Sequence, residues 1–146
     1  MGTTNKTLSA TVPSLADRDN IKCFRNRVSI VGLATAEVVQ CLSIPAGMLV
    51  LNVMVKVVTP EASGAATATI GDGAGANSWD DSTNLAAAAG TVTAGVGGTD
   101  AYVTSGKLYA ADTIDAVLTL AAGPATSGVF DIMAICVEFP PTAGSV

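Results

Sequence analysis

The side chains best suited to chemistry in this sequence are carboxylates in one Gly-rich stretch. Asp72, Asp80 and Asp81 lie with Asn77 within a run of ten residues. Such oxygen-rich groups are typical Ca²⁺ ligands, but the spacing differs from that of an EF-hand loop. Asp and Asn also favour turns, because their side chains bond nearby backbone groups. The sequence therefore predicts a turn-rich loop here, and no metal is assigned to it.

Two carboxylate pairs, Asp80 with Asp81 and Asp112 with Asp115, have the residue types of a glycosidase acid–base pair. The chain has only three Phe, two Tyr and one Trp, so no aromatic platform for a sugar is visible. Asp112 and Asp115 also flank the start of a strand candidate, where one of the two is simply exposed. Glycoside hydrolysis is not expected.

Three glycines, Gly71, Gly73 and Gly75, alternate after another strand candidate. They do not form the GxGxxG pattern, no helix signal follows, and the lysine of a P-loop is missing, so a nucleotide site is not expected. The chain also contains no histidine, which removes the commonest general base and metal ligand. We predict that the protein is not an enzyme and carries no cofactor.

The composition is that of one domain with a substantial core, because 49% of the 146 residues are hydrophobic and only 13% are charged. The net charge of −5 disfavours nucleic acid as a partner. No apolar run approaches the ~18 residues of a membrane span, and a soluble protein without membrane contact is expected. The three cysteines contain no CxxC pair, so Cys41 and Cys136 are predicted to be buried free thiols in a protein made in a reducing cytoplasm.

The charge is distributed unevenly along the chain. Residues 1–34 carry a net charge of +3, whereas residues 35–146 carry −8. A basic leader on an acidic body suggests that the leader meets an acidic surface, although an ordinary solvated leader would have the same composition. The residues expected to make such a contact are Arg18, Lys22, Arg25 and Arg27.

Apolar runs of strand length recur between Gly- and Pro-rich connections, and no long helical period is present. The segments 71–81 and 91–99 are predicted loops, 85–90 could form a helical turn, and 113–120 with 129–139 suggest a hairpin. The pattern predicts an all-β protein: an antiparallel β-sandwich of jelly-roll type, residues 28–146, behind an irregular N-terminal arm, residues 1–27. The expected strands are 27–31, 36–44, 48–58, 64–70, 113–120 and 129–139.

The segment 48–58 is the most hydrophobic strand candidate, and side chains alternate between the two faces of a strand. Read as an uninterrupted strand, it places Leu49, Leu51, Val53, Val55 and Val57 in the core. The opposite face is mixed, and we interpret it as a second buried surface shared with a neighbouring subunit. That face carries Met48, Val50, Met54 and Val58 around the polar Asn52 and Lys56.

Trp79 is the one large aromatic residue in the predicted loop 71–81. It is interpreted as a plug at the end of the sandwich or, alternatively, as an anchor of a subunit contact, since Trp is favoured at interface hot spots.

Three regions of the chain resemble small structural proteins of tailed bacteriophages. These are Ile44-Pro-Ala-Gly47, the pair Ile70-Gly-Asp-Gly73 and Ser78-Trp-Asp80, and the segment from Thr104 to Ile114. The likeness runs over roughly residues 28–139 and is a pattern of strand-entry and loop motifs rather than a catalytic signature. The chain is most similar to capsid decoration (cement) proteins with a jelly-roll-like fold.

The resemblance implies a homo-oligomer, most often a trimer, on the outside of a phage head. Such proteins clamp neighbouring copies of the major capsid protein against the pressure of packaged DNA, and they have no catalytic residues. The expected location is therefore the virion surface. Two alternatives remain open: another virion part, such as a head-fibre base or tail protein, and a jelly-roll module that binds carbohydrate or Ca²⁺ for host attachment.

Overall fold

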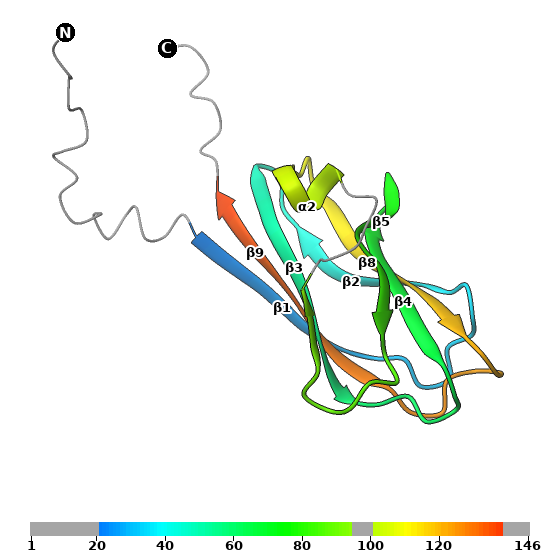
Figure 1. The fold of residues 1–146 in the computed structure, drawn as a ribbon. Coiled ribbons are helices and arrows are strands. Elements are labelled where there is room, and N and C mark those ends of the chain that lie inside the picture. Colours follow the sequence, from blue (N-terminus) through cyan, green and yellow to red (C-terminus); the bar gives the residue numbers. More distant parts are fainter. Residues whose placement is uncertain (1–20, 95–100, 139–146) are drawn as a thin grey trace, which may run out of the picture.

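The computed structural model describes residues 21–94 and 101–138. Two antiparallel sheets pack face to face as a β-sandwich, with the hydrophobic core between them (Figure 1). The all-β sandwich predicted from the sequence is therefore confirmed. Residues 1–20, which hold most of the predicted arm, lie outside the described residues.

The five-stranded sheet has β9 (Val129–Glu138) and β3 (Met48–Thr59) at its centre. β1 (Ile21–Ser29) pairs with β9, and the short strands β6 (Val92–Ala94) and β7 (Lys107–Leu108) both pair with β3. Because β1 and β9 are antiparallel, β1 begins and β9 ends at the same end of the sandwich.

The four-stranded sheet has the order β2 (Val38–Ile44), β8 (Asp112–Leu120), β4 (Ala66–Asp72) and β5 (Gly75–Asn84). The chain crosses repeatedly between the two sheets, so most sequence neighbours are not sheet neighbours. This is the strand order of a jelly roll. The helix α2 (Ala101–Ser105) precedes β7, and the predicted helical turn at 85–90 forms turns instead.

The core is formed by one face of each sheet, because successive side chains of a strand point to opposite sides. In β9, for example, Phe130, Ile132, Ala134 and Cys136 are buried while their neighbours are partly exposed. The two predicted buried thiols are confirmed, since Cys41 and Cys136 are buried and free. The largest side chains that are almost completely buried are Trp79, Tyr109, Phe130, Ile30, Ile44, Ile70, Leu85, Ile114, Leu118 and Ile132.

A β-bulge at Leu51 changes which side chains of β3 face the core. Val50 is opposite Cys136 and Asn52 is opposite the next residue, Ile135, so Leu51 has no partner on β9. Met48 and Val50 therefore point inward before the bulge, and Val53 points inward after it. The prediction that Leu49 and Leu51 belong to the core was wrong, because it assumed an uninterrupted alternation.

The predicted loop 71–81 is largely a hairpin of β4 and β5. Gly71 is explained by the close approach of the two strands rather than by a loop. A Cβ atom on Gly71 would lie 2.0 Å from the carbonyl oxygen of Gly75. The high Gly content was therefore misread as a sign of irregular structure.

The predicted hairpin of 113–120 and 129–139 does not form, because β8 and β9 belong to different sheets. Their connection crosses the end of the sandwich and is held there by the buried Glu61. The carboxylate of Glu61 accepts hydrogen bonds from the backbone N–H groups of Ser63, Thr126 and Ser127 and from two hydroxyls. Burial alone would raise the pKa of Glu61, but these hydrogen bonds outweigh it and lower the pKa to about 2.

Candidate interaction surface on the five-stranded sheet

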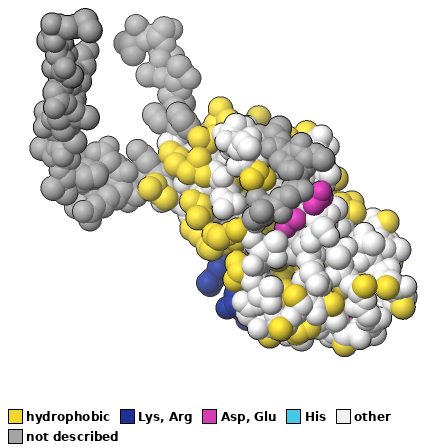
Figure 2. Space-filling model, viewed as in Figure 1, with side chains coloured by type: hydrophobic (Ala, Val, Ile, Leu, Met, Phe, Trp, Pro, Cys, Tyr) yellow, Lys and Arg dark blue, Asp and Glu magenta, His cyan; other side chains and the backbone are white. Residues whose placement is uncertain are grey.

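The outer face of the five-stranded sheet carries an unusual number of hydrophobic side chains. We call this surface the apolar face; its members are Ile21, Leu49, Leu51, Met54, Leu108, Met133, Ile135 and Val137. Figure 2 shows hydrophobic side chains gathered where β1, β9 and β3 lie, with Lys and Arg side chains beside them.

The strand register arranges these side chains in rows across the sheet. Ile21, Val137, Leu49 and Leu108 form one row at the end where β1 begins. Ile21 is 66% exposed and Leu108 is 58% exposed. Large apolar side chains in such numbers on one sheet face mark a contact surface more often than a solvated one.

The bulge at Leu51 contributes directly to this surface. Leu51 is 43% exposed, and it lies next to Asn52, whose partner on β9 is Ile135. Because the bulge adds a residue without adding a core position, its side chain extends the apolar face at no cost to the packing inside.

The opposite end of the same face is charged. Arg27, Asp131 and Lys56 form one row across β1, β9 and β3, and Arg25 lies in the row above, opposite Met133. Arg27 donates to both oxygens of Asp131, at 2.7 and 2.9 Å. This fork of hydrogen bonds lowers the pKa of Asp131 and raises the pKa of Arg27.

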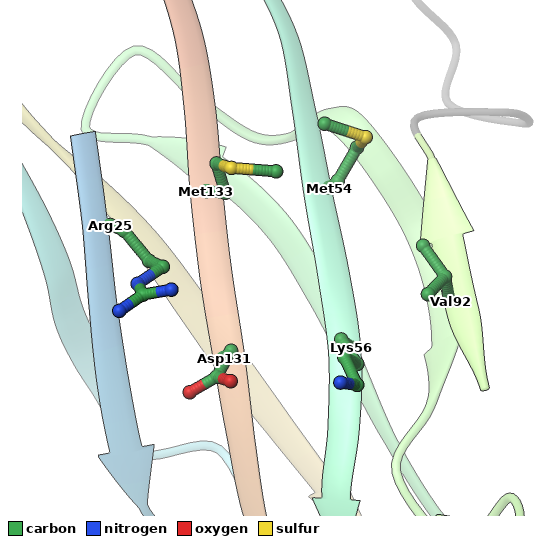
Figure 3. A pocket seen from close by; sticks show the side chains of 6 residues that line it. All are labelled: Arg25, Met54, Lys56, Val92, Asp131 and Met133. Atoms are coloured by element: carbon green, nitrogen blue, oxygen red, sulfur yellow. The ribbon is translucent and has the colours of Figure 1, made fainter. Parts of the chain in front are cut away.

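A pocket of about 200 Å³ lies where the apolar and charged parts of the face meet. Figure 3 shows the side chains that line it on four adjacent strands: Arg25 from β1, Asp131 and Met133 from β9, Met54 and Lys56 from β3, and Val92 from β6. The structure thus brings together Arg25, predicted as a capsid contact, and Met54, predicted as an oligomer contact.

The other predicted interface residues are divided between this face and the core. Val58 is partly buried, whereas Met48, Val50 and Trp79 are 5%, 0% and 0% exposed. Those three side chains are enclosed within this chain, so they have no surface to offer a neighbouring subunit. For Met48 and Val50 the reason is the bulge at Leu51. For Trp79 it is the contact with the ring of Tyr102 in α2 and the hydrogen bond to Tyr109.

Trp79 belongs to a buried polar cluster at one end of the sandwich, which supports its interpretation as a plug. Its Nε1 donates to the hydroxyl of Tyr109 at 3.0 Å, and that hydroxyl donates to Asp72 at 2.9 Å. Lys107 pairs with Asp72, and its ammonium lies 4.7 Å from the ring centroid of Tyr102. Burial raises the pKa of Tyr109, with the Asp72 charge adding to it.

The carboxylate of Asp72 is thus used to hold this end of the fold together. Besides Lys107 and Tyr109, it accepts the backbone N–H groups of Ala74 and Gly75. Burial would raise the pKa of Asp72, but these contacts outweigh it and lower the pKa.

The other carboxylates that the sequence analysis considered do not form one site. Asp80 accepts hydrogen bonds from Ser82 and Thr83, while Asp81 and Asp112 are exposed. Asp115 is buried, its Oδ1 has no hydrogen-bond partner among the described residues, and burial raises its pKa. Within residues 21–94 and 101–138, no group of three or more His, Cys, Asp or Glu side chains is placed to hold a metal ion.

The predicted basic contact residues lie mainly on β1. Residues 21–27, which the sequence assigned to the arm, form most of this strand. Lys22 pairs with Glu138, and Arg27 pairs with Asp131. Arg18 lies outside the described residues. In the part of the chain that the structure describes, no helix has the length and apolar character needed to cross a membrane.

Sequence reasoning missed Asp131, Met133 and Lys56 as members of one site. The sequence did contain a signal for Asp131 and Met133. Asp131 interrupts an otherwise apolar strand, and because it is two residues from Met133 the two side chains point to the same side of that strand. What was missing was the knowledge that β1 and β3 flank β9, since this pairing joins segments about 80 to 100 residues apart in the sequence.

No known protein-family model matches the chain, and no curated protein matches it by sequence. Its fold is similar to solved structures. A chain in the capsid of Ralstonia phage GP4 matches with a TM-score of 0.61 and 14% identity, over 83% of this chain and 86% of that one. A chain in the cyanophage Pam1 capsid asymmetric unit matches with a TM-score of 0.57 and 16% identity, over 82% of this chain and 86% of that one.

A third match comes from the acidic stable capsid structure of the Helicobacter pylori bacteriophage KHP30. The TM-score is 0.53 and the identity 14%, over 83% of this chain and 94% of that one. At these identities the likeness shows a shared fold.

Proposed function

We propose that this protein is a structural component of a phage capsid, and specifically a decoration (cement) protein that binds the outside of the head as a homo-oligomer. The observation that carries the proposal is the apolar face on a jelly roll whose fold is shared with chains of three phage capsids. Its role is mechanical rather than catalytic, because the polar clusters described above serve to hold the fold together.

The apolar face supports the homo-oligomer. Ile21, Leu51 and Leu108 expose large side chains that a partner surface would remove from water. A closed ring, for which we propose a trimer, buries such a patch on every copy without growing into a fibre. Met54 and Val58 are the predicted interface residues that remain outside the core.

The basic residues support a contact with the major capsid protein. Lys22, Arg25 and Arg27 are all carried by β1, and Arg18 precedes that strand in sequence. Arg25 and Arg27 lie on the side of the apolar face, whereas Lys22 lies on the opposite side of the strand. Positive side chains on the rim of an apolar surface favour an acidic partner and set its orientation.

The proposal is tested by adding the purified protein to phage heads that lack their outer proteins and measuring co-sedimentation and cryo-EM density. We expect density on the outer surface at symmetric positions and an oligomeric mass in solution. Immunogold labelling of complete particles separates head from tail. Labelling at the tail would replace this proposal by that of a tail component, and absence of the protein from particles would reject a virion role.

A further inference from the structure

The pocket between β1, β9, β3 and β6 contains two cations whose charge is only partly balanced among the described residues. Asp131 attracts both of them, and this attraction helps to lower its pKa, but Arg27 already occupies both of its oxygens. The side chains of Arg25 and Lys56 make no ion pair with any described residue. They line the pocket from the strands on either side of Asp131.

The rest of the pocket wall is hydrophobic. Met54 and Met133 face each other across β3 and β9, and Val92, which is 57% exposed, closes the side at β6 (Figure 3). Methionine side chains are flexible and polarisable, so they adapt to the shape of an inserted group. The site therefore offers an apolar slot with positive charge at its mouth.

We propose that this pocket binds a carboxylate carried on a short apolar stem, namely a Glu or Asp side chain with an apolar neighbour, projecting from a partner protein. A guanidinium binds a carboxylate through two parallel hydrogen bonds, and an ammonium adds a third donor. That the partner is the capsid shell protein rests on the function proposed above, whereas the chemistry of the pocket does not. The two proposals are compatible when the contact between copies is centred on the row of Ile21, Val137, Leu49 and Leu108 and leaves the pocket at its margin open.

The apolar wall of the site, more than its charge, favours a side-chain carboxylate over a phosphate. Asp131 remains in the wall, and its pKa is lowered by the hydrogen bonds from Arg27, so it stays ionised. It weakens the attraction of the pocket for every anion, and Met54, Met133 and Val92 then favour a group with an apolar stem. The net charge of −5 on the whole chain acts in the same direction against nucleic acid.

The test uses the full chain and two small probes with amidated C-termini. They are N-acetyl-leucyl-glutamyl amide, whose one charge is the side-chain carboxylate, and its neutral isostere N-acetyl-leucyl-glutaminyl amide. Binding is followed through the methyl NMR signals of the methionines. We expect the glutamate probe to shift the signals of Met54 and Met133 in a saturable way, with roughly tenfold weaker binding of the glutamine probe. The buried Met48 serves as an internal reference, because its signal should not move.

Charge variants separate this pocket from general electrostatics. We expect R25Q and K56Q each to weaken the glutamate probe by roughly tenfold. D131N should bind it more tightly, since it removes the resident negative charge. The matched control is K22Q, which removes a cation of the same strand that is already paired with Glu138. Binding of the glutamate probe to K22Q should be the same as to the unaltered protein.

The inference is overturned if both probes bind equally, if K22Q weakens binding as much as R25Q, or if the signals of Met54 and Met133 do not respond. The same variants in the co-sedimentation test distinguish this failure from that of the proposed function. If the protein binds the probe but no phage head, the pocket is supported and the proposed partner is rejected. If R25Q and K56Q bind heads as well as the unaltered chain, the proposed function stands, but the pocket is not the site that contacts the head.

Discussion

The two outer faces of this sandwich are built from the same kind of strands and yet carry different side chains. On the five-stranded sheet the outward positions are largely Ile, Leu, Met and Val, as described for the apolar face. On the four-stranded sheet the outward positions at the centre are Thr67, Thr69, Val117 and Thr119, which we call the threonine face.

The difference cannot come from the needs of the core, because both sheets bury their inner faces equally well. Threonine suits a strand that faces water, since it is β-branched and its hydroxyl remains hydrated. Ile21 and Leu108, at the two ends of one row, have no polar group that water could hydrate. The outward side chains therefore make the apolar face the better candidate of the two for the proposed protein contact.

The strongest test of the boundary between core and apolar face is W79A. Trp79 was a candidate for the interface, but its side chain is fully buried and its Nε1 is hydrogen-bonded to Tyr109. We expect the substitution to lower the free energy of unfolding by about 4 kcal/mol, as large-to-small changes of buried aromatics do. Chemical denaturation of the protein at low concentration measures it. A stable domain with lost association would instead place Trp79 at the interface.

M54D tests the comparison of the two faces itself. A carboxylate at the margin of the subunit contact should weaken association by about 2 kcal/mol or more, while the monomer, where Met54 is only partly buried, stays folded. The matched control is T69D at the centre of the threonine face, for which we expect no change in oligomeric mass. Sedimentation velocity measures both. Unfolding of M54D would show that both sides of β3 are core and that the interface lies elsewhere.

E61Q tests what keeps the two sheets, and hence the two faces, in place. The neutral amide should cost about 2 kcal/mol of unfolding free energy near pH 7, since it loses charge-assisted hydrogen bonds across the end of the sandwich. The control is E37Q, because the side chain of the exposed Glu37 accepts, within the described part of the chain, one local hydrogen bond, from the backbone N–H of Ala34. Denaturation curves of both variants provide the measurement.

The stabilisation by Glu61 also depends on pH. Its pKa in the folded protein is about 2, below the ordinary value of 4.5. The contribution is therefore complete above pH 4.5 and is lost as the pH falls toward about 2. The difference in stability between the unaltered protein and E61Q should shrink over that range, and a constant difference would contradict the assignment.

The smallest effect is expected for L51T. Leu51 lies on the bulge and is largely free of the core, so monomer stability should change by less than about 0.5 kcal/mol. Self-association should weaken by a few-fold, because less apolar area is buried in the contact. V38T, an exposed valine on the four-stranded sheet, should leave association unchanged. Equal effects of the two would remove the distinction between the faces.

Most of the fold could be predicted from the alternation of apolar residues and the turn-forming residues between them. The strands 48–58 and 129–139 were found with nearly their observed limits. The bulge at Leu51 could not be found, because Leu49, Leu51 and Val53 alternate in sequence just as core residues do. The hairpin at Gly71 was missed because its glycines serve close packing of strands.

The candidate site was predicted only in parts. Met54 and Arg25 were singled out for separate contacts, since nothing local in the sequence links residues on β3 and β1. Their common pocket depends on β9 lying between them, which is a property of the jelly-roll strand order. Long-range strand pairing of this kind carries no local signal in one sequence.

The bulge in β3 also bears on how this strand tolerates changes in chain length. Losing one residue from a strand normally turns every following side chain to the opposite side. Without Leu51, Val50 and Asn52 would be consecutive residues paired with Cys136 and Ile135. The hydrogen-bond ladder between β3 and β9 would then be continuous at this point. Met48 and Val53 would both keep their inward positions. At this point of the chain, the outer surface can gain or lose a residue while the interior remains the same.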